Sequence, residues 1–362
     1  MAQTEEQIRA ALAQLIDPVT QRDYESSGDV KTVTLDGNDV SVEIVLGYPA
    51  KSLVDDVKRS IAGTLKALPD IGKVSVSVTT NIVAHAAQAG LKLLPGIKNV
   101  IAVASGKGGV GKSTTTANLA LALAAEGAKV GILDADIYGP SQQMMMGLSG
   151  RPESADGKTI EPMEIYGVQT MSIGLLIDVD QPMVWRGPMV TQALEQLLRD
   201  TQWKELDYLV VDLPPGTGDI QLTLSQKVPL TGAVIVTTPQ DIALIDARKG
   251  LKMFEKVNVP ILGIVENMST HICSRCGHEE HIFGEGGAAR MSADYEIDLL
   301  GQLPLDMRIR EQVDSGRPTL VTEPDGDISR IYKEIARKVA AKISSQKRDY
   351  GGAFPKIVVQ NT

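Results

Sequence analysis

The sequence has very little cysteine. Cys273 and Cys276 are its only thiols in 362 residues. Two thiols do not make a disulfide framework, so we expect the chain to work in the reducing cytoplasm. No apolar run approaches the length of a membrane span, and the polar, acidic N-terminus is unlike a secretory signal. Basic residues are also in deficit, 36 against 45 acidic residues, giving a net charge of −9. We therefore expect neither a membrane nor nucleic acid as partner.

The length and the pattern of apolar residues predict two domains. Residues 1–83 read as helix, strand, strand, helix, strand, and residues 84–98 read as a linker. From residue 99 to residue 345, short apolar runs alternate with helical stretches, which is typical of buried parallel strands joined by crossover helices. One hairpin, at 159–173, interrupts this alternation as an antiparallel edge, and residues 346–362 form a tail. The predicted fold is a doubly wound, mostly parallel α/β sheet behind a small α/β domain.

The first strand of the large domain runs into SGKGGVGKSTT, which fits the pattern G-x-x-x-x-G-K-S/T of a phosphate-binding loop. Glycines let backbone N–H groups turn toward phosphate oxygens, and the following helix adds its dipole. Lys112 is expected to reach the β- and γ-phosphates of ATP, and Ser113 to ligate Mg²⁺. The nucleotide-binding residues expected here are Gly106, Lys107, Gly108, Gly109, Val110, Gly111, Lys112, Ser113 and Thr114.

Lys107 is a second lysine in this loop, and it is electrostatically costly unless it meets an anion, such as that of a neighbouring subunit. The stretch KGGVGKST resembles the deviant Walker A loop of the MinD, ParA and nitrogenase iron protein class. The resemblance implies a homodimer in which Lys107 reaches the partner's phosphates and takes part in catalysis.

Other polar residues stand at the ends of predicted strands. By the same resemblance, Asp136 orients the attacking water and Asp134 lies nearer the metal; alternatively, both carboxylates cap a helix. Asp212 suits Mg²⁺ bound through water. The loop that follows it contains Gly216 and Gly218, which would let it move when the γ-phosphate leaves. Asn267 offers a donor and an acceptor to an adenine edge, which Pro304 and Leu305 could flank.

Several motifs together resemble the bacterial Mrp/ApbC family of P-loop ATPases that carry iron–sulfur clusters. They are SGKGGVGKST, DADIYGPS, VDLPPGTGD, ENMS followed by a CxxC loop, and the tail RDYGGAFPKIVVQNT. The resemblance covers nearly the whole chain. It implies a carrier that receives a cluster from upstream scaffold proteins and passes it to apoproteins, with slow ATP turnover. Some relatives carry a cysteine in the N-terminal domain, whereas the corresponding GYPAKS here has none.

The two cysteines can be interpreted in three ways. A 4Fe–4S cluster needs four thiolates, which two copies of CSRC would supply across a dimer axis. Zinc could instead bind Cys273 and Cys276 with His278 and His281, although that spacing is unusually tight. A redox pair normally precedes a helix after an early strand, unlike this pair. Spacing alone leaves cluster and zinc about equal, and the family resemblance favours the cluster, with Arg275 offsetting its charge.

Two other functions compete with a cluster carrier. A ParA- or MinD-like positioning ATPase with a zinc-binding CxxC loop would need a basic surface or an amphipathic C-terminal anchor, and the tail is neither strongly basic nor helical in period. A zinc-stabilised metabolic kinase would leave Lys107 without a role. The sequence therefore favours an ATP-hydrolysing cluster carrier.

Overall fold

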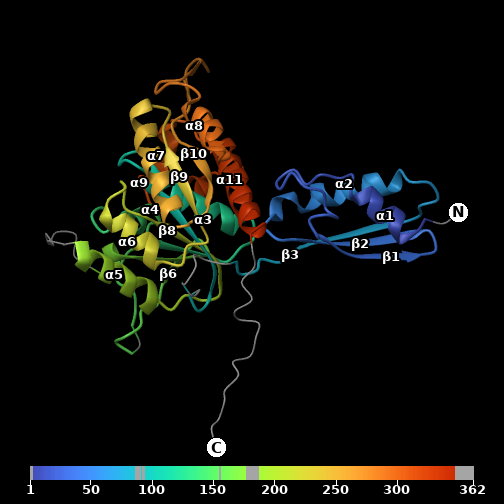
Figure 1. Cartoon of the computed structure of the whole chain (residues 1–362), viewed down its shortest axis with the longest axis horizontal. Coiled ribbons are helices and arrows are strands. Elements are labelled where there is room, and N and C mark those ends of the chain that lie inside the picture. Colours follow the sequence, from blue (N-terminus) through green and yellow to red (C-terminus); the bar gives the residue numbers. More distant parts are fainter. Residues whose placement is uncertain (1–2, 86–90, 92–93, 155, 177–186, 347–362) are drawn as a thin grey trace, which may run out of the picture.

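The computed structural model describes residues 3–85, 91, 94–154, 156–176 and 187–346. These residues form a small N-terminal domain and a larger domain beside it (Figure 1). No helix in the described part of the chain is both long and apolar enough to cross a membrane.

The N-terminal domain follows the predicted order. Its elements are α1 (Glu5–Leu12), β1 (Val30–Asp36), β2 (Asp39–Leu46), the 3-10 helix η1 (Lys51–Leu53), α2 (Val54–Lys66) and β3 (Val74–Thr80). β1 and β2 form the expected hairpin, and β3 joins β2 in parallel. Alternate β2 residues are buried because apolar and polar residues alternate along the strand, so that one face of the sheet packs on the helices.

The large domain contains, within the described residues, one eight-stranded sheet. Its strands, in order across the sheet, are β13 (Leu299–Gln302), β10 (Ile261–Glu266), β9 (Gly232–Thr237), β4 (Ile97–Ala104), β8 (Leu206–Asp212), β5 (Val130–Asp134), β7 (Val168–Ser172) and β6 (Met163–Ile165). All neighbours are parallel except β6, which pairs antiparallel with β7 at the edge. The predicted fold class and antiparallel edge are confirmed.

Helices cover both faces of this sheet. The helical segments are α3 (Lys112–Ala125), α4 (Gln142–Met145), η2 (Ile173–Leu175), α5 (Gly187–Asp200), α6 (Asp219–Lys227), α7 (Asp241–Lys256), α8 (Gly287–Tyr295), α9 (Met307–Asp314), α10 (Thr319–Thr322) and α11 (Asp327–Ser344). One apolar core joins the sheet to α3 and α11, and a second joins its other face to α5, α6, α7 and α8. Such a sheet places its ligand site at the carboxyl ends of the strands.

The first strand of the large domain begins earlier than predicted. β4 starts at Ile97, inside the segment expected as a linker, because Ile97 is buried and pairs with Leu206 of β8. Lys98 lies between the apolar Ile97 and the polar Asn99, so the strand pattern is hidden in the sequence. It points to the surface, where its ammonium is 2.7 Å from Asp207.

A buried polar joint connects the two domains. Glu126 follows α3 and is buried; its carboxylate accepts hydrogen bonds from the hydroxyl and the backbone N–H of Ser52, at 2.6 and 3.0 Å. Arg337 of α11 lies 2.7 Å from the same carboxylate. The backbone N–H of Lys51 donates to the Glu126 carbonyl. The N-terminal domain is therefore fixed to the far end of the helix that follows the phosphate loop.

Candidate nucleotide site and cysteine hairpin

The phosphate loop connects β4 to α3 and depends on its glycines. Gly109 and Gly111 have φ of +82° and +84°, in the left-handed region that glycine adopts freely. A side chain at Gly111 would also collide with Asn267, since its Cβ would lie 2.1 Å from the amide nitrogen. Gly106 meets the backbone at Asp246 of α7 equally closely. The loop therefore keeps its backbone curved at the N-terminus of α3, as phosphate binding requires.

Lys112 lies at the centre of the predicted site and is 6% exposed. Its ammonium is 2.6 Å from Asp212, 3.1 Å from the Ser113 hydroxyl and 3.6 Å from Asp136. The structure thus brings together the four side chains that the sequence assigns to phosphate, magnesium and water. In this arrangement carboxylates hold the cation that a nucleotide phosphate would bind.

Two further side chains complete this cluster, and the sequence analysis missed both. Thr116 donates to one oxygen of Asp212 at 3.0 Å, and Gln142 donates to the other at 2.9 Å and to the Ser113 carbonyl. The position of Thr116, one helical turn after Lys112, could have indicated its role. Gln142 carries no comparable signal, because it reaches the site from the start of a separate helix, α4.

Asp134 organises the loop after β5. Its carboxylate accepts backbone N–H bonds from Ser141 and Gln142 at 2.9 and 3.0 Å, and a 3.1 Å bond from the Ser172 hydroxyl. These bonds match the alternative of a carboxylate at a helix start, here α4. Burial, together with the charge of Asp212, raises the pKa of Asp134 to about 7.

Asp136 follows in the same loop and is 8% exposed. Burial raises the pKa of its carboxyl group, and the ammonium of Lys112 opposes that shift. Asp136 is therefore a nearly buried carboxylate whose oxygen lies 3.6 Å from the Lys112 ammonium.

Lys107 belongs to the phosphate loop, and Asn267 lies against it. Lys107 is exposed and, among the described residues, no ion pair to its ammonium is found. It lines a hollow of about 330 Å³ together with Met268 and Phe283. Asn267 is buried and donates its amide N–H to the Val110 carbonyl at 2.9 Å, so it supports the loop directly.

Pro304 and Leu305 lie in a segment that runs beside the residues following β10. The backbone N–H of Leu303 donates to the Glu266 carbonyl, and that of Leu305 donates to the Thr270 carbonyl. The structure thus places the predicted adenine-flanking pair and Asn267 on adjacent segments.

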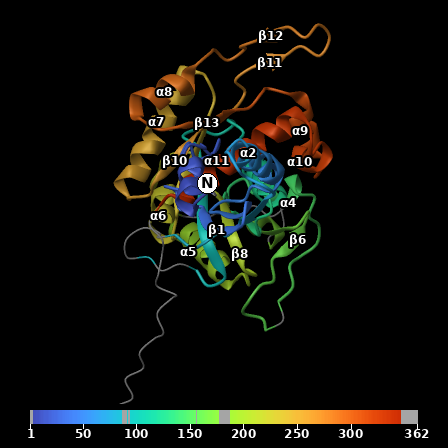
Figure 2. The same cartoon turned by 90° about the vertical axis from the view of Figure 1, so that its right-hand side faces the viewer.

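The cysteines lie at the tip of a short hairpin that projects from the body of the molecule (Figure 2). Its strands are β11 (His271–Ile272) and β12 (Glu279–Glu280), paired antiparallel. The turn is closed by bonds from the Cys273 N–H to the His278 carbonyl and from the Gly277 N–H to the Cys273 carbonyl. Cys276 is exposed. Backbone N–H groups of Arg275 and Cys276 lower the pKa of the Cys273 thiol, which favours the thiolate that metals bind.

The histidines do not complete a metal site in one chain. Among the residues the structure describes, no three His, Cys, Asp or Glu side chains gather closely enough to hold a metal ion. His281 uses its Nδ1 on the Ser269 carbonyl, at 2.9 Å, and His271 uses its Nδ1 on the Leu305 carbonyl, at 3.0 Å. The side chain of His278 is 67% exposed. The single-chain Cys₂His₂ zinc site is therefore not assembled.

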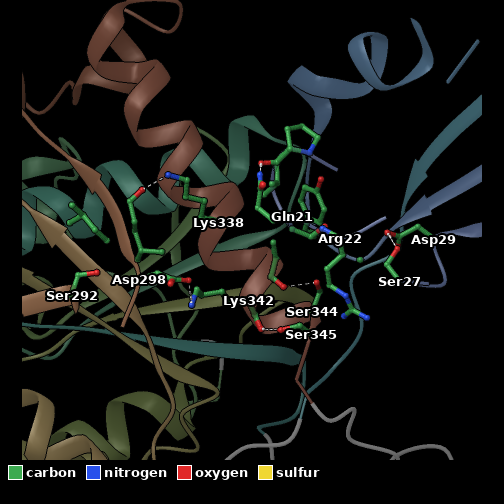
Figure 3. A pocket seen from close by; sticks show the side chains of 18 residues that line it. Gln21, Arg22, Ser27, Asp29, Ser292, Asp298, Lys338, Lys342, Ser344 and Ser345 are labelled. Carbon is green, nitrogen blue, oxygen red and sulfur yellow. Dashed lines mark hydrogen bonds and ion pairs between the residues drawn. The ribbon is translucent and has the colours of Figure 1, made fainter. Parts of the chain in front are cut away.

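A larger cavity, of about 680 Å³, lies between the domains and away from this chemistry (Figure 3). Arg22 of the N-terminal domain lines it opposite Lys338 and Lys342 of α11. Lys342 is paired with Asp298, and Lys338 donates to the Leu300 carbonyl. Both lysines that α11 contributes to this cavity are therefore already engaged within the chain.

Residues 96–340 match the family model described as NUBPL iron-transfer P-loop NTPase, and residues 5–78 match that of an iron-sulfur cluster assembly protein. An iron-sulfur cluster carrier protein of Haemophilus influenzae is 48% identical over 94% of this chain and 93% of its own length. The iron-sulfur cluster transfer protein NUBPL of Mus musculus is 52% identical over 70% of this chain and 80% of its own.

Solved structures agree with these matches. A nucleotide-binding protein of Archaeoglobus fulgidus in complex with ADP is 40% identical, with a TM-score of 0.57 over 65% of this chain and 91% of that one. The cell division ATPase MinD of Pyrococcus furiosus, 24% identical with a TM-score of 0.50, shares the fold over 67% of this chain and 98% of its own. The phosphate loop, the carboxylate cluster and the matched length lead to one conclusion: the chain belongs to the family of NUBPL iron-transfer P-loop NTPases.

Proposed function

We propose that this protein is an ATP-hydrolysing iron–sulfur cluster carrier. Two subunits hold one 4Fe–4S cluster between their cysteine hairpins, receive it from an upstream scaffold protein and transfer it to apoproteins. The observation that carries the proposal is the hairpin itself, which presents Cys273 and Cys276 at an exposed tip without further ligands from its own chain, among the described residues. The thiolates must stay reduced, which suits the cytoplasm.

The number of ligands supports a shared site. A 4Fe–4S cluster is held by four thiolates, and one chain supplies two. A twofold axis through the hairpin tips would supply the other two. A cluster bound at an exposed tip is also accessible to an acceptor protein, as a carrier requires.

The nucleotide site supports Mg-ATP binding and slow hydrolysis. A γ-phosphate would compete with Asp212 for the Lys112 ammonium, and Ser113 and Asp212 would then be free to face Mg²⁺, directly or through water. Asp136 would orient the attacking water. Lys107, exposed beside the loop, is suited to reach the phosphates of the second subunit.

One chain segment connects the two sites. Asn267 supports the phosphate loop and could contact adenine, and the hairpin strand β11 starts four residues later, at His271. A change in nucleotide state could therefore move the cysteines and alter the geometry that holds the cluster. This connection would couple ATP turnover to cluster release.

Cluster transfer tests the proposal. The reconstituted protein is mixed anaerobically with the apo-form of an enzyme that needs a 4Fe–4S cluster, and the recovered enzyme activity is followed over time. We expect recovery with wild-type protein and with His278→Ala, and none with Cys276→Ala. Recovery that matches a control of free iron and sulfide, or that persists in Cys276→Ala, would contradict a carrier role for the hairpin.

A further inference from the structure

A glutamine beside the nucleotide site has no assigned role. Gln221 lies in the first turn of α6 and is 2% exposed. Neither its amide nitrogen nor its amide oxygen has a hydrogen-bond partner among the described residues. Leaving such a group unpaired costs about 1–3 kcal/mol. A buried amide with both ends free is therefore expected to serve a ligand or a bound water.

The surroundings of Gln221 indicate which one. It lines a hollow of about 650 Å³ between two loops that end neighbouring strands. One wall contains Asp136, Tyr138 and Gly139, from the loop after β5. The other contains Pro214, Pro215 and Gly218, from the loop after β8, and residues 219–221 at the start of α6. Asp136, in turn, faces Lys112 at 3.6 Å. Gln221 thus lines the same hollow as Asp136, which is one of the two carboxylates within 4 Å of the Lys112 ammonium.

We propose that Gln221 is a positioning residue for the water that attacks ATP. The inference rests on the proposed ATP hydrolysis and on the role of Asp136. A bound water needs two to four polar partners. The Asp136 carboxylate can accept one hydrogen bond from it, and the Gln221 amide offers both a donor and an acceptor.

The reaction needs no other reactant. The water oxygen forms a bond to the γ-phosphorus while the bond from that phosphorus to the ADP oxygen breaks. One proton of the water stays on the phosphate and the other is released. Two partners fix the direction of attack, whereas Asp136 alone would leave the water free to rotate about a single contact.

The loop between Asp212 and α6 gives this position a second property. Gly216 has a φ of +100°, and Gly218 immediately precedes α6, so the loop can change shape when the phosphate leaves. Because Gln221 is the third residue of α6, directly after this loop, movement of the loop would carry its amide away from the water. Hydrolysis would then be possible only in the ATP-bound arrangement.

Gln221→Leu tests the proposal, because it keeps the volume and removes both hydrogen-bonding groups. We expect kcat for ATP hydrolysis to fall by about 10- to 100-fold with little change in KM. Binding of ADP with aluminium fluoride, which mimics the transition state with its water, should weaken by a similar factor. Binding of a non-hydrolysable ATP analogue should stay within about threefold, because the analogue does not need the water.

Gln312→Leu is the matched control. Gln312 lies on α9, away from the phosphate loop, and its amide oxygen is also buried and unpartnered within the described residues. We expect hydrolysis at the wild-type rate. Gln221→Asn keeps an amide on a shorter side chain and should recover part of kcat. It carries the test if the leucine variant does not fold.

Unchanged kcat in Gln221→Leu would overturn the assignment of Gln221 alone, and so would equal losses of both nucleotide complexes, which would indicate a structural role. A wild-type protein that binds ATP without hydrolysing it would overturn the proposed ATPase and this inference together.

Discussion

Lys112 is the residue on which the nucleotide site depends, through its ammonium group. In this structure it contacts Asp212, Ser113 and, at longer range, Asp136. These contacts neutralise part of a buried cluster of carboxylates. ATP brings its own anions, so its binding requires Lys112 to exchange one partner for another. This exchange links nucleotide binding to the positions of Asp136, in the loop after β5, and of Asp212, at the end of β8.

Replacing Lys112 with alanine tests this role. We expect Lys112→Ala to lower ATP hydrolysis by roughly a hundredfold or more and to weaken nucleotide binding, because the β- and γ-phosphates lose their cation. Lys98→Ala is the control, since Lys98 also pairs with a carboxylate but lies where β4 begins. Steady-state turnover and a fluorescent nucleotide titration measure both effects. Wild-type turnover in Lys112→Ala would show that the site lies elsewhere.

The raised pKa of Asp134 implies that the free energy of unfolding depends on pH. Its pKa is raised to about 7 in the folded protein, against 3.8 for an ordinary aspartate. Between these values the folded state holds a proton that the unfolded state releases, so the contribution of Asp134 to stability falls as pH rises toward 7. We expect the stability of wild type relative to Asp134→Asn to fall by up to a few kcal/mol between pH 5 and pH 8. Urea unfolding of both proteins measures it, and parallel pH curves would contradict the account.

Individual strands and helices could be predicted where a single segment shows the alternation of a strand or the period of a helix. The β1–β2 hairpin and α11 follow from alternation and helical period, and the β6–β7 edge from its short hairpin. The start of β4 was missed because its pairing with β8 lies in another part of the chain. The phosphate loop was found because its function fixes the spacing of its residues.

Other features depend on tertiary placement, so no local pattern indicates them. Gln142 and Gln221 lie at the starts of two different helices, α4 and α6, and have no motif of their own. The joint of Ser52, Glu126 and Arg337 joins residues that are 285 positions apart at the extremes. These residue types are common throughout the chain, and only their burial and proximity in the folded protein give them a particular role.

The joint gives a prediction about how the domains are held. Glu126 is buried, and Arg337→Met would leave its carboxylate without the ion pair, which is expected to cost about 3–5 kcal/mol. Adding Glu126→Gln should restore part of that stability. Arg330→Met, on the exposed face of the same helix, should have little effect. Denaturant unfolding measures all four proteins, and equal effects of the two arginine changes would contradict a structural role for the joint.

At the scale of the whole molecule, the N-terminal domain and the nucleotide site lie at opposite ends of α3, and the cysteine hairpin lies close to the nucleotide site. The N-terminal domain is attached where α3 ends, the nucleotide site lies where α3 begins, and the cysteine hairpin follows β10 near the same loop. α3 is almost entirely buried between the sheet and α11, so a displacement at the phosphate loop would be carried along a rigid helix. This arrangement suits a carrier whose cluster site responds to nucleotide.

The claim most open to direct contradiction is that each chain supplies half of the cluster site. Iron and acid-labile sulfide per protein, measured after anaerobic reconstitution, test it in wild type, Cys273→Ala, Cys276→Ala and the double variant His278→Ala with His281→Ala. The account predicts about four irons and four sulfides per dimer in wild type and in the histidine variant, and almost none in either cysteine variant. One tightly bound zinc per chain, without sulfide and lost with the histidines, would contradict it.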